Sequence, residues 1–182
     1  MLTYHAYAGR IVGEHGLRVP VEPGARLLSE TASWQLAHRV VGTWTEDLDT
    51  DKVPSTVTSY VLHLAGELAE HLVDPSDLRD HAERLCQVIE NAPRAKGQRA
   101  NLPQELVKVV ATQQLRVALL PLVEEYAQSK RREGAMDFAD QMSLAALLAA
   151  EHPEVVAGER ARYGAVLLDE YQDTGHAQRV LL

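Results

Sequence analysis

Apolar residues recur at helical spacing along most of this chain, and this periodicity restricts the fold more than any other feature of the sequence. The longest periodic stretch runs from Pro103 to about Arg132, and Pro121 is expected to kink it or split it in two. Shorter periodic stretches, separated by Pro, Gly or polar turns, cover residues 2–15, 27–44, 54–72, 76–91 and 137–150. Ser76 and Asp137 can cap the helices that begin beside them, and the segment EHPEV is expected to break the helical pattern around Pro153. These patterns predict a mainly α-helical protein.

One short segment departs from the helical pattern. Residues 164–168 read Gly-Ala-Val-Leu-Leu, a continuous apolar run that is typical of a strand buried on both faces of a parallel sheet. A parallel strand is not stable alone, and no other convincing strand is evident in the sequence. We expect its partner strands to lie outside this chain; strands that the sequence pattern conceals are the alternative. The expected fold is therefore mainly α with one strand near 164–168.

The composition is that of a globular protein, with 46% hydrophobic and 24% charged residues. The net charge of −8 argues against a domain whose whole surface binds nucleic acid, because phosphate contacts need clustered Lys and Arg. The single cysteine, Cys86, fits a reducing compartment. Neither a signal-peptide core nor an apolar run near the roughly 20 residues that span a bilayer is evident, so a cytoplasmic location is expected.

Acidic residues are concentrated immediately after the strand-like run, at Asp169, Glu170 and Asp173. Open α/β sheets bind ligands at the carboxyl ends of their strands, and Mg²⁺ keeps several waters, so one or two carboxylates suffice to hold it. One carboxylate could then hold the hydrated metal of a nucleotide while its neighbour takes a proton from the attacking water. The alternative is a surface turn in which residues 173–175 cap a helix.

Three segments resemble motifs of one protein family. The segment LLDEYQDTGHAQ is similar to motif II of the UvrD/PcrA/Rep/RecB class of superfamily 1 DNA helicases, in which an acidic pair, an aromatic residue, Gln, Asp and Thr follow in that order. The segment LTYHAYAGRIVGEHG resembles the family's Thr-aromatic-His segment, and MDFADQMSLAALL resembles the Asp-Phe segment that precedes its acidic motif. The three segments occur in the family's order and span nearly the whole chain.

The resemblance implies a RecA-like motor domain that is interrupted by a helical insertion. Residues 1–16 would flank the interruption, 17–135 would form the insertion, and 136–182 would return to the motor domain. The family's Gly-rich phosphate loop is missing, because RAKGQRA has neither its spacing nor a preceding strand. We therefore expect a fragment that starts after that loop, stops just past the acidic motif and hydrolyses no ATP alone.

For the nucleotide site, the resemblance implies ATP and Mg²⁺ as cofactors of the intact protein. Asp169 would bind the metal, and Glu170 would be the general base. Gln172 and Asp173 would belong to the nucleotide site and couple it to the DNA-binding motifs. Thr174 is expected to be a helix cap rather than a catalytic hydroxyl.

For DNA, Thr3 and His5 match the family's segment that contacts the single strand, although Thr3 could equally be an ordinary helix cap. The insertion approaches duplex DNA in relatives, and two basic runs are candidate phosphate contacts. The first run is Arg94, Lys96 and Arg99, and the second covers residues 130–132. For both runs the simpler interpretation is a solvated surface. The cations of the second run lie near the expected C-terminus of a helix, where they would also interact favourably with the helix dipole.

The resemblance thus implies a fragment of an ATP-dependent DNA helicase that translocates 3′ to 5′ on single-stranded DNA in repair or recombination. Its partners would be ATP, single-stranded DNA and duplex DNA. No association with a membrane is expected. One further candidate partner is another helicase or nuclease chain of the same assembly. A second hypothesis is a non-catalytic helical module that binds duplex DNA or a protein.

Overall fold

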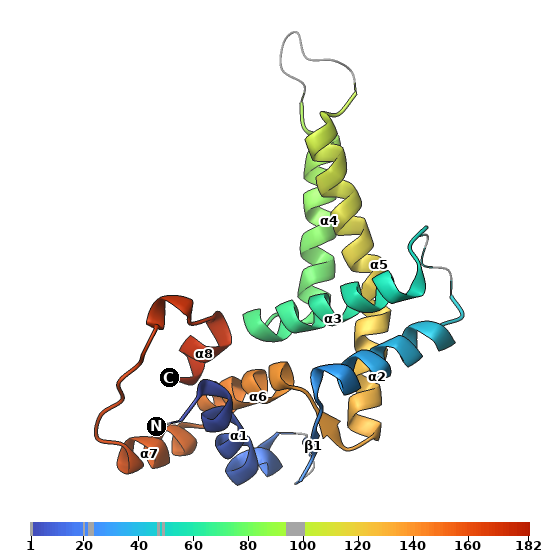
Figure 1. The fold of residues 1–182 in the computed structure, drawn as a ribbon. Coiled ribbons are helices and arrows are strands. Elements are labelled where there is room, and N and C mark those ends of the chain that lie inside the picture. Colours follow the sequence, from blue (N-terminus) through green and yellow to red (C-terminus); the bar gives the residue numbers. More distant parts are fainter. Residues whose placement is uncertain (1, 20, 22–23, 47, 49, 94–100) are drawn as a thin grey trace.

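Helices make up most of the part of the chain that the structure describes, which is residues 2–19, 21, 24–46, 48, 50–93 and 101–182 of a computed structural model (Figure 1). The α-helices are α1 (Tyr4–His15), α2 (Glu30–Thr43), α3 (Pro54–His71), α4 (Pro75–Asn91), α5 (Gln104–Arg132), α6 (Phe138–Glu151), α7 (Pro153–Arg162) and α8 (His176–Leu181). The short elements are η1 (Gly16–Arg18) and η2 (Tyr171–Asp173), which are 3₁₀ turns, and strands β1 (Arg26–Leu27) and β2 (Ala135–Met136). The prediction of a mainly α fold is confirmed.

Side-chain caps determine where several helices begin, because they accept hydrogen bonds from backbone N–H groups that have no partner within the helix. Thr3 caps α1, and Asp137 caps α6 as the sequence predicts. At α4 the cap is Asp74 and not the predicted Ser76, whose N–H donates to Asp74 Oδ1 at 2.8 Å. The sequence predicted only a break near Pro153, but this residue opens α7, because proline is well tolerated at the first helical position.

The helix α5 is continuous, so Pro121 does not split it. Leu119, Leu120, Leu122 and Val123 around the proline are all buried, and their packing offsets the backbone hydrogen bond that proline removes. By length and composition alone α5 could also cross a membrane, a test that the core helices of soluble proteins pass as well.

The helices pack into two hydrophobic cores. The α2–α3–α5 core draws its buried residues from those three helices, together with Leu28 and Ala135. The α1–α6–α8 core draws most of its buried residues from those helices, together with Val19, Met136 and Val155 of α7. Each core therefore combines segments that are distant in the sequence.

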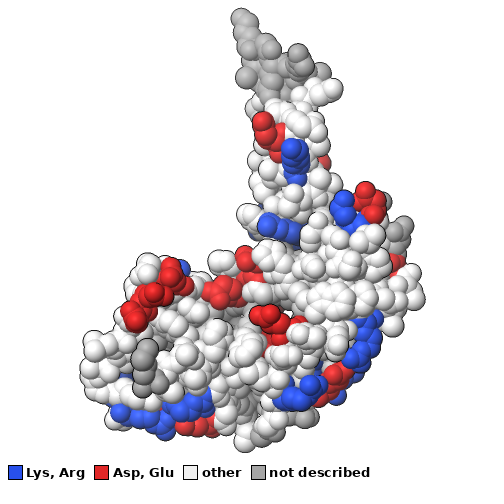
Figure 2. Space-filling view, viewed as in Figure 1, with Lys and Arg blue, Asp and Glu red and all other residues white. Residues whose placement is uncertain are grey.

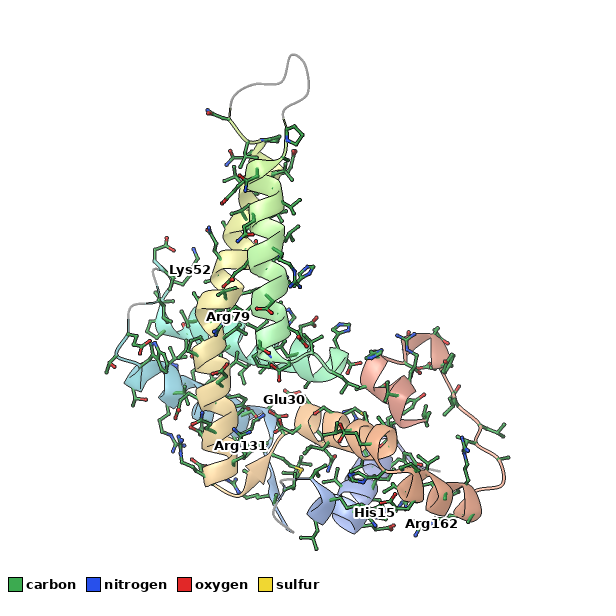
Figure 3. The ribbon with its side chains drawn as sticks, turned by 180° about the vertical axis from the view of Figure 1, so that it is seen from behind. His15, Glu30, Lys52, Arg79, Arg131 and Arg162 are labelled. Atoms are coloured by element: carbon green, nitrogen blue, oxygen red, sulfur yellow. The ribbon has the colours of Figure 1, made fainter. Side chains whose placement is uncertain are left out.

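Beyond both cores, α4 and the first half of α5 (residues 104–117) extend as an antiparallel pair, which we call the arm (Figure 1). Ala82, Ile89 and Val110 are its buried apolar residues. Seen from behind, Arg79 lies near the base of the arm and Arg162 at the end of α7 (Figure 3). The arm is thus the part of the described chain that reaches farthest from the rest.

The two short strands join the cores. β1 and β2 pair in parallel, with Arg26 opposite Ala135 and Leu27 opposite Met136. Ala135 belongs to the α2–α3–α5 core and Met136 to the α1–α6–α8 core, because successive side chains of a strand point to opposite faces.

Residues 164–168 do not form the predicted strand. They lie in a loop between α7 and η2, and the one sheet in the described part of the chain is the β1–β2 pair elsewhere (Figure 1). Leu167 is 96% exposed, and Val166 is exposed as well. The prediction of a buried strand is therefore wrong for these residues, because the described part of the chain provides no neighbouring strand for their backbone groups to bond.

Candidate functional site

The acidic residues predicted for catalysis lie on a tight turn that follows this loop. Glu170 has a left-handed backbone conformation (φ 49°, ψ 43°) and directly precedes η2. Its N–H donates to Asp169 Oδ1 at 3.1 Å, and the N–H of Asp173 donates to the Glu170 carbonyl at 2.9 Å. Such a backbone conformation is strained in a residue other than glycine, and strained residues are concentrated at functional sites.

The predicted nucleotide-site residues Asp169, Glu170, Gln172 and Asp173 are all exposed. Acidic side chains gather on the surface around η2 and α8 (Figure 2). Exposed carboxylate oxygens suit Mg²⁺, which needs only one or two of them when it keeps its waters. Within the described ranges no group of three or more His, Cys, Asp or Glu side chains is arranged to hold a metal. The acidic pair could therefore supply one or two of the ligands of a Mg²⁺ ion, but not a complete set of ligands.

The Thr-aromatic-His segment forms the start of α1. The Thr3 hydroxyl accepts a hydrogen bond from the N–H of Ala6 at 3.2 Å, which is the capping role that the sequence also allowed. His5 is exposed and meets Phe138 edge-on, with ring centroids 5.3 Å apart and an interplanar angle of 83°. Tyr4 is half-buried, and its hydroxyl lies 3.0 Å from Thr174 Oγ1.

These contacts bring together the three segments that resemble helicase motifs. Tyr4 joins the start of α1 to the turn after the acidic residues, and His5 joins it to the start of α6. Phe138 is 43% exposed beside His5; it belongs to the Asp-Phe segment, but no role was predicted for it. The available signal was a large aromatic side chain in the first turn of a helix, directly after its capping Asp137.

Thr174 does not have its predicted capping role. Gly175 precedes α8, and its N–H donates to Gln178 Oε1 at 3.1 Å, while the Thr174 hydroxyl pairs with Tyr4. Glu70 of α3 lies against Gly175 so closely that a Cβ there would be 1.5 Å from Glu70 Oε1. The turn after the acidic motif therefore contacts α1 on one side and α3 on the other.

A buried charge cluster lies beside the start of α6. Lys130 Nζ lies 2.6 Å from Asp137 Oδ2 and 2.7 Å from Asp140, and the Tyr126 hydroxyl donates to Asp137 Oδ2 at 3.1 Å. Burial alone would raise the pKa of Asp137, but the Lys130 ammonium, with the hydrogen bonds from the Asp140 N–H and the Tyr126 hydroxyl, outweighs it and the pKa is lowered. At Asp140 burial dominates and, with the charge of Asp137, leaves the pKa raised. Lys130 is only 5% exposed, so it is not available as the predicted phosphate contact.

The other candidate DNA contacts, Arg94, Lys96 and Arg99, lie outside the described residues. The arm carries further exposed cations on its described surface: Arg79, Arg84, Lys108 and Arg116. Acidic side chains are interspersed with them, so both signs of charge appear along the arm (Figure 2). The arm therefore has local cations without a surface of one sign.

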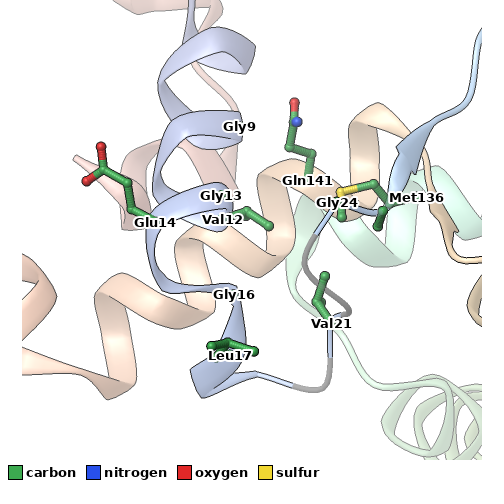
Figure 4. A pocket seen from close by; sticks show the side chains of 11 residues that line it. Gly9, Val12, Gly13, Glu14, Gly16, Leu17, Val21, Gly24, Met136 and Gln141 are labelled. Atoms are coloured by element: carbon green, nitrogen blue, oxygen red, sulfur yellow. The ribbon is translucent and has the colours of Figure 1, made fainter.

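A cavity of about 220 Å³ lies between the second half of α1 and the start of α6 (Figure 4). Its lining includes Gly9, Gly13, Gly16, Gly24, Val12 and Met136, with Glu14 and Gln141 as the polar side chains. None of the predicted site residues lines it. We attribute this cavity to the way α1 and α6 pack, and the candidate site remains the turn at residues 169–174 with the adjoining helix starts.

Residues 1–182 match the family model of the UvrD/REP helicase N-terminal domain. Similar proteins include three whose names describe a subunit of an ATP-dependent helicase/nuclease. The relative from Natranaerobius thermophilus is 30% identical over 111 residues, which are 60% of this chain and 8% of the relative. The relative from Streptococcus thermophilus is 38% identical over 64 residues, which are 35% of this chain and 5% of the relative. The relative from Streptococcus pneumoniae is 40% identical over 60 residues, which are 33% of this chain and 5% of the relative. The matched part is at most 8% of the length of these relatives. Because the family model covers the whole chain, this protein belongs to the UvrD/REP helicase N-terminal domain family.

Proposed function

We propose that this chain is part of an ATP-dependent DNA helicase, in which it carries the acidic motif of the Mg-ATP site and part of the path of the single strand. The observation that carries the proposal is the contact between motif-bearing segments, Tyr4 with Thr174 and His5 with Phe138. The family match and the relatives named as ATP-dependent helicase/nuclease subunits support it. The whole protein would translocate 3′ to 5′ on single-stranded DNA in repair or recombination, in the cytoplasm. Its candidate protein partner is another helicase or nuclease chain of the same assembly.

At the nucleotide site, Asp169 would hold the magnesium ion that accompanies ATP, and the ion would neutralise charge on the phosphates. Glu170 would accept the proton of the attacking water, because it is the adjacent carboxylate on the same strained turn. Gln172 and Asp173 follow on η2 and would line the nucleotide site. The Gly-rich phosphate loop, a motif that is missing from this sequence, would come from another part of the protein.

At the strand site, the Thr3 hydroxyl and the His5 imidazole would donate hydrogen bonds to phosphate oxygens. The exposed ring of Phe138 lies beside His5 and adds an aromatic surface on which a base can stack. Arg94, Lys96 and Arg99 remain candidate contacts to duplex phosphates.

The two hydrophobic cores support a division into a helical insertion, residues 17–135, and two flanking pieces of the motor domain, residues 1–16 and 136–182. All buried residues of the α2–α3–α5 core fall within the insertion, and those of the α1–α6–α8 core fall outside it except for Val19. The exposed apolar loop at 164–168 would complete a sheet with strands from other parts of the motor domain.

The test uses Glu170→Gln in the full-length protein, which removes the base and keeps the shape of the side chain. Nucleotide binding should be retained, and ATP turnover should fall by about 100-fold or more. Glu151→Gln, at the exposed end of α6, is the matched control and should turn over ATP as the unmodified protein does. Unchanged turnover in Glu170→Gln would refute the assignment.

The arm supports a second candidate function, a non-catalytic module for duplex DNA or a protein partner. It projects from both cores and carries exposed cations such as Arg79 and Lys108 (Figure 1). In that case the isolated chain should bind duplex DNA with nanomolar affinity at a physiological salt concentration of about 0.15 M. Weak binding that is lost steeply with added salt is the result expected for a helicase fragment.

A further inference from the structure

A side-chain hydrogen bond connects the turn that carries the acidic pair to the first helix. Tyr4 Oη and Thr174 Oγ1 lie 3.0 Å apart, although the two residues are separated by 170 positions in the chain. Across the described ranges, this is the one hydrogen bond that joins residues 164–174 to another helix. We call these two residues the hydroxyl pair.

On one side of the hydroxyl pair, Thr174 is closely linked to Glu170. The N–H of Asp173 donates to the Glu170 carbonyl at 2.9 Å, and the N–H of Thr174 donates to the Tyr171 carbonyl at 3.1 Å. Glu170 itself is held in the left-handed region (φ 49°). A strained residue persists only when its surroundings determine its position, so a shift of Thr174 would be passed to the Glu170 carboxylate.

On the side that precedes the acidic pair, the chain offers little restraint. Val166 and Leu167 are exposed, and no sheet partner lies beside them within the described ranges. The turn is therefore positioned from its C-terminal side, where Thr174 meets Tyr4 and Gly175 meets Glu70.

On the other side of the hydroxyl pair, Tyr4 is the first residue of α1 and lies between Thr3 and His5. The N–H of Tyr7 donates to the Thr3 carbonyl at 3.0 Å, so Thr3, Tyr4 and His5 belong to one rigid first turn. Tyr4 packs against the α1–α6–α8 core while both neighbours are exposed. A ligand that binds the exposed neighbours would therefore also reposition the Tyr4 hydroxyl.

We propose that Tyr4 and Thr174 are positioning residues that couple occupancy of the Thr3–His5 segment by a single-stranded nucleic acid to the position of Glu170. This inference rests on the proposed function, and it adds two residues that neither bind the strand nor touch the nucleotide. A neutral hydrogen bond of this kind is worth roughly a twofold to tenfold change in an equilibrium, which sets the size of the expected effect.

The experiment measures ATP turnover of the full-length protein with and without a saturating oligodeoxythymidylate. Tyr4→Phe removes only the hydroxyl, and it should lower the ratio of stimulated to unstimulated turnover by roughly twofold to tenfold. Thr174→Val should lower it equally, Thr174→Ser should retain it, and the double variant should be no worse than either single one. Tyr60→Phe on α3 is the matched control and should leave the ratio unchanged.

A second measurement follows the contact itself. Hydrogen exchange at the amides of Asp173 and Thr174 in the 182-residue chain should be faster in Tyr4→Phe, with amides in the middle of α6 unaffected. An unchanged stimulation ratio in Tyr4→Phe, additive effects of Tyr4→Phe and Thr174→Val, or unchanged exchange would each overturn the inference. If Glu170→Gln loses turnover while Tyr4→Phe keeps its stimulation, only the coupling fails; full turnover in Glu170→Gln overturns both proposals.

Discussion

Lys130 Nζ lies 2.6 Å from Asp137 Oδ2, so the last turn of α5 is tied to the residue that caps α6. The ammonium also lies 2.7 Å from Asp140 and 4.4 Å from the centre of the Tyr126 ring. Tyr126 belongs to the α2–α3–α5 core, and α6 to the other core. This buried cluster therefore connects the two cores by electrostatics, next to the point where β2 connects them by packing.

Replacing Lys130 by Met should lower the free energy of unfolding by about 3 kcal/mol, because it leaves two half-buried carboxylates without their buried counter-charge. Denaturation by urea would measure the loss. Lys52→Met is the control, since Lys52 is solvent-exposed and pairs with its exposed neighbour Asp51, and it should leave stability unchanged. A Lys130→Met variant as stable as this control would show that the cluster does not hold α5 and α6 together.

The phenol of Tyr7 should titrate later than an ordinary tyrosine. Burial, with the nearby carboxylate of Glu159, raises the pKa of Tyr7 from 10.0 to about 12. A raised pKa means that the folded state favours the neutral phenol, so the stability contributed by this group is present below pH 10.0 and is lost as the pH rises towards about 12. Tyr7→Phe should remove one late-titrating phenol from the ultraviolet absorbance titration and leave that of Tyr126, whose pKa is also raised by burial. Tyr171→Phe, on the exposed η2 turn, should leave both late-titrating phenols in place.

Two glycines of α1 should respond differently to the same substitution. A Cβ at Gly13 would meet no atom within 4 Å, so Gly13→Ala should stabilise the helix by about 0.5–1 kcal/mol. A Cβ at Gly9 would lie 2.6 Å from Gln141 Nε2, so Gly9→Ala should be less stabilising than Gly13→Ala, because the end of the Gln141 side chain must move.

Thermal unfolding of both variants measures the difference. Adding Gln141→Ala should relieve Gly9→Ala, because the clash involves only that side chain. If Gly9→Ala is as stabilising as Gly13→Ala, the close packing of α1 on α6 is not a constraint on the fold.

The apolar loop should contribute almost nothing to the stability of this chain. Leu167 is 96% exposed, so Leu167→Ser should change the free energy of unfolding by no more than about 0.5 kcal/mol. Leu148→Ala is the comparison, because Leu148 is fully buried in α6 and its truncation should cost about 2–5 kcal/mol. Equal losses in the two variants would mean that the loop is packed into a core.

Helix positions were largely predictable because their signals are local. Apolar periodicity, the capping Asp137 and the prolines at the starts of α3 and α4 act over a few residues, and the structure has helices with those starts. The order of the three motif-like segments was predictable as well, because this order is a property of the sequence alone. The errors at Ser76 and Thr174 are of one kind, since in each case the N-cap position falls on another residue, Asp74 or Gly175.

The sequence by itself determined a mainly helical chain, the ends of most of its helices and membership of a helicase family. Only the tertiary structure decided that Lys130 is buried between two carboxylates, that Tyr4 meets Thr174, and that residues 164–168 form an exposed loop. The physical reason is the range of the interactions. Caps and helical periodicity depend on residues within one or two turns, whereas ion pairs, hydroxyl contacts and strand pairing depend on partners brought close only when the chain folds.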